Sequence, residues 1–148
     1  MKVKMNGRPW AYSGKADDLV FCYNRFSGTM YARKKARHKS TAENERIGDT
    51  SRSIFGLNPS AGFKKDLQLY LLGYNRLREN RDKPVQSWSA MYLHLMHAMT
   101  RKVENVNLQT ITREEIYLRS LPCVSIRAAV EAGVLPAVNG WEGLERLL

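Results

Sequence analysis

Apolar residues recur every three or four positions in two long stretches of the chain, and this periodicity constrains the fold more than any other feature. The stretches are residues 61–80 and 87–104, and such spacing lines the apolar side chains along one face of a helix. The segment RDKP, residues 81–84, separates them. We therefore expect an antiparallel helix pair that forms the main core. The residues expected to be buried together are Leu67, Tyr70, Leu71, Tyr74, Met91, Leu95 and Met99.

The front of the chain has strand character instead. Residues 19–23 (LVFCY) and 29–33 (TMYAR) are rich in β-branched and aromatic residues. Between them, Asn24 and Gly28 suit turn positions with positive φ, so the pattern predicts a β-hairpin. An earlier strand is predicted over residues 9–12. A lone hairpin is marginally stable, so this one should pack on helices or on a partner.

Capping residues predict further helices. Ser40 with Glu43 opens a helix over residues 41–57, and Thr112 with Glu115 opens one over 113–119. Two more are predicted: residues 126–132, with Ser125 as N-cap and Gly133 as the C′ residue, and residues 142–148. The predicted fold class is α+β: an N-terminal β-hairpin with a basic shoulder (residues 1–39), then a mainly helical body (residues 40–148), together one compact unit.

The net charge of +10 is concentrated at the front of the chain. Residues 1–66 carry 14 Lys/Arg and 6 Asp/Glu, whereas residues 110–148 carry 4 and 5. The densest run, MYARKKARHKSTAENER over residues 30–46, has no acidic residue until Glu43. Aromatic residues lie close to it in sequence: Tyr12, Tyr23, Phe26 and Tyr31. Basic residues beside exposed aromatics are typical of surfaces that contact phosphates and stack on bases.

Five cations of this run are expected to form one exposed surface that binds nucleic acid or an acidic protein surface. These site residues are Arg33, Lys34, Lys35, Arg37 and Lys39. Such a basic arm is also common in chains that assemble with themselves or in larger particles. The alternative is a solvated joint between two folded pieces.

Motifs for catalysis and cofactor binding are missing from the sequence, including a P-loop, GxGxxG after a strand, HExxH and GxSxG. We expect no catalytic residue, cofactor or small-molecule substrate. His94 and His97 are three residues apart, but no carboxylate on the same helix completes a metal site. Cys22 and Cys123 are expected to act as small buried hydrophobes, and their pairing stays open.

The longest apolar stretches are too short to span a bilayer, and residues 1–10 lack the apolar core of a signal peptide. The expected protein has no membrane partner and is cytoplasmic or virion-associated.

Residues 13–66 begin with Ser-Gly-Lys, followed by an apolar strand, a glycine turn, a strand ending in Arg, a basic loop and an Arg-containing helix. This order resembles small uncharacterised proteins from phages and prophages of Bacteroidetes-like bacteria. The matching residues are Ser13, Gly14, Lys15, Val20, Gly28, Tyr31, Arg33, Thr41, Glu45 and Arg46. The resemblance implies a non-enzymatic phage-type or mobile-element protein, with a virion component as one form.

Residues 111–138 are similar to an excisionase-like winged helix-turn-helix, which implies DNA reading. The matching residues are Thr112, Glu115, Val124, Ser125, Gly133, Leu135 and Pro136. The segment departs from that pattern because its recognition helix is about one turn short and offers Arg127 alone as a donor, beside Glu131. The leading hypothesis is a non-catalytic structural or assembly protein that uses the basic N-terminal surface. A small DNA-binding regulator that uses the C-terminal segment is the alternative.

Overall fold

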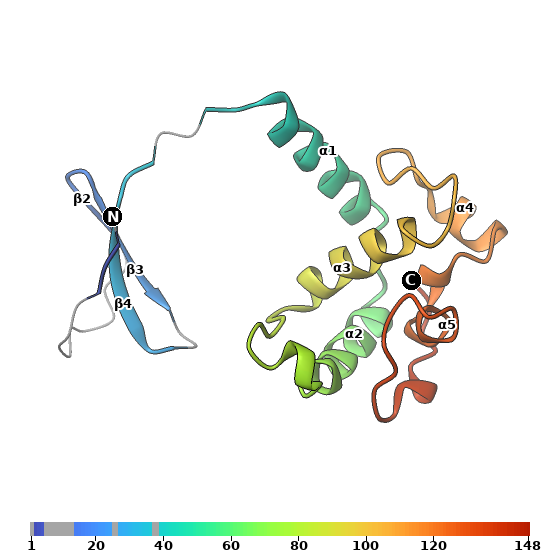
Figure 1. The fold of residues 1–148 in the computed structure, drawn as a ribbon. Coiled ribbons are helices and arrows are strands. Elements are labelled where there is room, and N and C mark those ends of the chain that lie inside the picture. The colour runs from blue at the N-terminus through green and yellow to red at the C-terminus, as the bar shows by residue number, and fades with distance from the viewer. Residues whose placement is uncertain (1, 5–13, 25–26, 37–38) are drawn as a thin grey trace. The chain divides into compact units, whose positions relative to one another are not determined.

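The computed structural model describes residues 2–4, 14–24, 27–36 and 39–148, and its strands precede its helices along the chain (Figure 1). The α+β class predicted from the sequence is confirmed. The chain divides into two compact units, residues 1–40 (unit 1) and residues 41–148 (unit 2).

Unit 1 contains a four-stranded antiparallel sheet with strand order β1-β4-β3-β2. The strands are β1 (Lys2–Lys4), β2 (Gly14–Ala16), β3 (Leu19–Asn24) and β4 (Thr29–Lys34). The predicted hairpin is confirmed as β3 and β4, which pair from Leu19 opposite Lys34 to Asn24 opposite Thr29. The sequence did not indicate β1 and β2, because three residues are too few to establish a periodicity. The strand predicted over residues 9–12 lies outside the described residues.

The turns of the sheet use residues with positive φ. Gly28, at φ +62°, follows the prediction for the β3–β4 turn. Asn24 does not, because it stays in β3 and its side chain instead accepts a 3.4 Å hydrogen bond from the Ser27 N–H. Asp17, at φ +49°, and Asp18 form the turn that joins β2 to β3.

Unit 2 is helical. Its α-helices are α1 (Ala42–Gly56), α2 (Ala61–Tyr74), α3 (Trp88–Thr100), α4 (Arg113–Leu118) and α5 (Ile126–Glu131). Three short 3-10 helices complete it: η1 (Arg78–Asn80), η2 (Pro122–Val124) and η3 (Trp141–Gly143). Each α-helix begins after a Ser or Thr whose hydroxyl accepts a backbone N–H three residues on, at 3.1–3.3 Å.

Two predicted caps differ in detail. Thr41, rather than Ser40, caps α1, because its hydroxyl accepts the Asn44 N–H. Thr112 caps α4 as predicted, but the Glu115 carboxylate does not complete a capping box: it pairs with Arg119 at 2.7 Å. Ser125 and Gly133 flank α5 as predicted, with Gly133 at φ +65°.

Two predicted helices differ in the structure. α2 stops at Tyr74 rather than at residue 80, and the Asn80 side chain donates to the Tyr74 carbonyl at 3.1 Å. The Asn75 side chain then bonds to both the N–H and the C=O of Val85. The helix predicted over residues 142–148 is wrong. The Arg146 N–H donates to the Asp66 carboxylate and the Leu148 N–H to the Val124 carbonyl, so neither makes a helical bond.

The core of unit 2 lies between α2 and α3 and extends over the segment that carries α4 and α5 (Figure 1). Phe63 and Tyr92 join the two helices by an edge-to-face ring contact at 6.0 Å. Six of the seven residues predicted to be buried together are buried. Leu71 is the exception, because it lies at the edge of the α2 stripe and is only partly buried.

Residues 136–148 pack along α2 in the opposite direction. The Tyr70 hydroxyl donates to the Pro136 carbonyl at 2.7 Å. Two glycines permit the close approach: a Cβ at Gly73 would lie 2.9 Å from Val138 Cβ, and one at Gly62 would lie 2.8 Å from Arg146 Cδ. The segment therefore forms a fixed wall beside α2.

Cys123 is buried, as expected, and burial raises the pKa of its thiol to about 12. Cys22 is only half-buried, and neither cysteine forms a disulfide within the described residues. In the described part of the chain, no helix has both the length and the apolar character to cross a membrane.

Candidate polyanion-binding sheet

The two units differ sharply in charge. Residues 1–40 contain ten Lys/Arg and two Asp/Glu, whereas residues 41–148 contain fourteen and twelve. Eight of the ten net positive charges therefore belong to a unit of 40 residues. A charge density of this kind attracts polyanions from solution.

The register of the sheet brings cations from separate strands onto one face. Arg33 of β4 lies opposite Val20 of β3, and Val20 lies opposite Lys15 of β2. Directly opposed residues of an antiparallel ladder share a face. Tyr31 belongs to this same face because it lies two residues from Arg33 along β4, and Cys22 lies opposite it. We call it the cationic face, and its members are Lys15, Val20, Cys22, Tyr31 and Arg33.

The opposite face of the sheet is apolar. It carries Leu19, Phe21, Tyr23, Met30 and Ala32, whose positions alternate with those of the cationic face. Met30 and Ala32 are buried, whereas Leu19 and Tyr23 are each 40% exposed. Lys34 ends this face opposite Leu19.

The structure separates the residues that the sequence grouped into one basic surface. Arg33 and Lys34 are both exposed but lie on opposite faces of β4. Lys35 follows the strand and its backbone N–H donates to the Asp18 carbonyl at 2.7 Å. Lys39 is exposed just before α1, and Arg37 lies outside the described residues.

The neighbouring aromatics also divide between the faces. Tyr31 is half-buried on the cationic face, and Tyr23 lies on the apolar one. Tyr12 and Phe26 lie outside the described residues. Among the aromatic residues proposed for base stacking, Tyr31 is thus placed beside Arg33 by the register.

Five described cations of unit 1 are available to an external anion. All six ion pairs among the described residues lie within unit 2. Lys15, Arg33, Lys34, Lys35 and Lys39 are exposed and have no ion-pair partner in the part of the chain that the structure describes. Their charge is therefore not neutralised within the described structure.

Sequence reasoning did not include Lys15 in the site. Lys15 belongs to the Ser-Gly-Lys motif noted in the sequence, but whether it shares a face with Arg33 depends on how β2 pairs with β3 and β3 with β4. In the register, β1 sets Lys2 opposite Arg33 and Lys4 opposite Tyr31.

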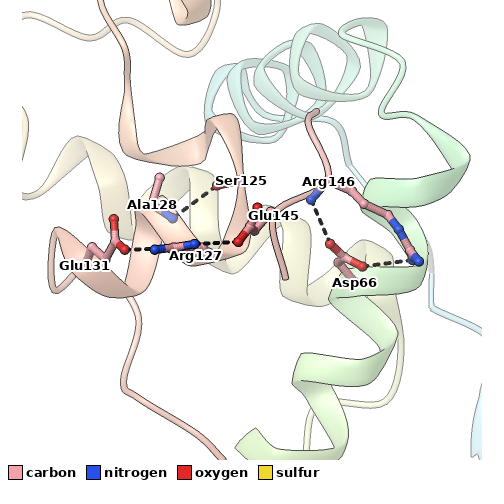
Figure 2. Close-up of polar contacts among 7 residues, drawn as sticks. All are labelled: Asp66, Ser125, Arg127, Ala128, Glu131, Glu145 and Arg146. Carbon is pink, nitrogen blue, oxygen red and sulfur yellow. Dashed lines mark hydrogen bonds and ion pairs between the residues drawn. The ribbon is translucent and has the colours of Figure 1, made fainter. Parts of the chain in front are cut away.

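The C-terminal segment that resembles a winged helix-turn-helix has its one recognition-helix cation engaged (Figure 2). The Arg127 Nε lies 2.8 Å from the Glu131 carboxylate, and its Nη1 bonds to the Glu145 carboxylate. α5 contains six residues. Residues 132–148, all of which the structure describes, contain no strand that could serve as a wing.

The two helical histidines have different surroundings. His94 lies with its ring 6.0 Å from that of Tyr74, and burial, followed by Arg101 and His97, lowers its pKa. His97 instead lines a hollow of about 610 Å³ beside Arg46 and Thr50. Within residues 2–4, 14–24, 27–36 and 39–148, no three His, Cys, Asp or Glu residues are placed to hold a metal ion.

Comparison with protein-family models, with curated proteins and with solved structures finds no match to this chain.

Proposed function

We propose that unit 1 binds nucleic acid through the cationic face of its sheet, and that the protein has a non-catalytic, structural or assembly role. The observation that carries this proposal is the row Lys15–Val20–Arg33, which sets two exposed cations on one face, with Tyr31 two residues from Arg33. Neither cation has an ion-pair partner among the described residues. Neighbouring strands are about 4.8 Å apart, so the two cations, separated by β3, are about 10 Å apart across the sheet.

This arrangement suits a phosphate backbone. Each cation that neutralises a phosphate releases a condensed counterion, which drives binding and makes it depend on salt. The Tyr31 ring, two residues from Arg33 along β4, adds a surface for a base or sugar. The resemblance of residues 13–66 to phage and prophage proteins favours a role in a mobile element, with virion association as the form proposed here.

The alternative, a DNA-binding regulator that uses the C-terminal segment, has less support. A DNA reader needs several free cations on its recognition helix. Arg127 is held by two carboxylates, and α5 is short. We therefore assign the interaction with nucleic acid to unit 1.

Arg33 and Lys34 provide a matched pair of variants for testing the proposal. R33S and K34S remove one charge each, from adjacent positions on opposite faces of β4. Affinities for a duplex and for a single-stranded oligonucleotide are measured at several salt concentrations. We expect R33S to weaken binding and to reduce the slope of log K against log salt by about 0.7–0.9, the value for one phosphate contact. K34S should change both quantities less.

Equal effects of R33S and K34S would contradict the assignment to one face, and failure of the parent protein to bind either oligonucleotide would contradict nucleic-acid binding. Polyglutamate serves as the control polyanion. If it competes as well as DNA at equal charge, the partner is an acidic protein surface. Circular dichroism of both variants checks that the sheet is retained.

A further inference from the structure

A groove runs along the outer side of α2, between this helix and residues 137–146. Two hollows of about 530 and 410 Å³ form it, and they share Leu69 and Leu72. Lys65 and Arg146 line the first hollow, and Arg76 and Val138 line the second. We call this surface the α2 groove.

The floor of the groove exposes two large apolar side chains. Leu69 and Leu72 are 55% and 63% exposed and, three residues apart, are neighbours on the surface of α2. The partly buried Leu77 continues the apolar surface in the second hollow. Adjacent exposed leucines in a hollow are typical of a protein-interaction site.

Cations flank these leucines. Lys65 and Arg76 lie four residues before Leu69 and four after Leu72, and both are exposed. Arg146 adds a third cation, although Asp66 partly neutralises it at 3.0 Å. None of the described residues that line the two hollows is a carboxylate.

The wall opposite α2 is held in place. The backbone N–H and the guanidinium of Arg146 both bond to Asp66, and Gly73 allows Val138 to approach α2 closely (Figure 2 for Asp66 and Arg146). Since both walls are fixed in the free protein, a ligand would not have to order them on binding.

We propose that the α2 groove binds an amphipathic helix of a partner protein, with leucine-sized side chains on one face and acidic residues beside them. In helix-in-groove recognition, an amphipathic helix lays its apolar face into a hydrophobic groove, and Leu69 and Leu72 supply the apolar floor of this one. The flanking cations select acidic residues in the partner and oppose a basic one. This site is distinct from the cationic face and does not depend on its function.

A labelled model peptide tests the proposal on the full chain. The probe is a 14-residue helical peptide with leucines at i, i+3, i+4 and i+7 and glutamates elsewhere, and its control replaces the glutamates with lysines. Fluorescence anisotropy should show saturable binding of the acidic peptide and much weaker binding of the lysine peptide. L72S should raise the Kd about tenfold, as expected for the loss of one buried leucine contact.

L118S is the matched control, because Leu118 is 88% exposed on α4 and does not line the α2 groove. It should bind the peptide as the parent does. The double variant K65S/R76S should weaken binding and reduce its salt dependence. Melting temperatures of all variants should match the parent, because these side chains are exposed.

Three outcomes would overturn the proposal. The first is that the acidic peptide does not bind saturably, or that L72S and L118S have equal effects. The second is a parent dimer in light scattering that L72S dissociates, which would make the groove an interface between two copies. The third is that K65S/R76S weakens oligonucleotide binding as much as R33S does, which would assign these cations to nucleic acid.

Discussion

Asp66 and Arg146, 80 residues apart in sequence, are joined by two hydrogen bonds: the carboxylate of Asp66 accepts the backbone N–H and the Nη1 of Arg146, each at 3.0 Å. Asp66 is 2% exposed, whereas the Arg146 side chain is 56% exposed. Burying a carboxylate costs free energy unless the group is hydrogen-bonded or paired. The bonds to Arg146 meet this need for Asp66, so the contact holds residues 144–148 on α2.

The first prediction concerns this anchor. D66N keeps the size of the side chain but loses the charge and replaces one accepting oxygen with an amide N–H₂, which only donates. We expect it to reduce the free energy of unfolding by about 1–3 kcal/mol. R146A should cost less, because the backbone N–H bond to Asp66 remains. Urea denaturation measures both variants. If D66N and the double variant D66N/R146A both matched the parent in stability, the contact would contribute nothing.

The second prediction separates two leucines of α2. Leu67 is fully buried, and L67A should cost about 2–5 kcal/mol. Leu71 is only partly buried, so L71A should cost clearly less than L67A. Thermal or urea unfolding gives both values. Equal losses would mean that Leu71 belongs to the core as the sequence periodicity alone suggests.

The third prediction compares two helix glycines. A Cβ at Gly73 would meet Val138 at 2.9 Å, so G73A should be destabilising by about 1–3 kcal/mol despite the better helix propensity of alanine. A Cβ at Gly48, in α1, would meet only Arg52 Nη2, at 3.9 Å, so G48A should stabilise the protein by up to about 1 kcal/mol. The opposite signs, read from melting temperatures, test the packing of residues 136–148 on α2.

The fourth prediction concerns the C-terminal segment. R127A should leave the affinity for DNA and its salt dependence unchanged, because Glu131 and Glu145 already neutralise the guanidinium. The same titration that compares R33S with K34S measures it. Loss of sequence-specific binding in R127A would restore the winged-helix alternative.

The fifth prediction concerns the independence of unit 2. All residues of its buried core lie between Ile54 and Leu148. A chain of residues 41–148 should therefore unfold cooperatively, with a melting temperature within about 3 °C of the full chain. Calorimetry measures this directly. A fragment without a cooperative transition would mean that unit 1 contributes to the core of unit 2.

Local patterns in the sequence were sufficient to identify most of the elements. The spacing of Phe63, Leu67, Tyr70 and Tyr74 predicted α2, and the helix starts at Thr112 and Ser125 followed from hydroxyls that cap the next turn. The alternation in residues 19–33 likewise predicted the β3–β4 hairpin. Each of these depends on residues within a few positions of one another, where side-chain chemistry and backbone preference act directly.

Contacts between distant segments decided the rest. Whether residues 142–148 form a helix depended on Asp66 and Val124, which take the backbone N–H groups of Arg146 and Leu148. The composition of the cationic face depended on strand pairing, which sets Lys15 and Arg33 in one row on either side of Val20. Alternation along β4 turns Lys34 to the other face. Sequence alone determined where charge accumulates and which segments are helical or extended. The tertiary structure decided which charges share a surface. A one-residue step along a strand turns a side chain to the opposite face of the sheet, and no local pattern shows which strands will pair.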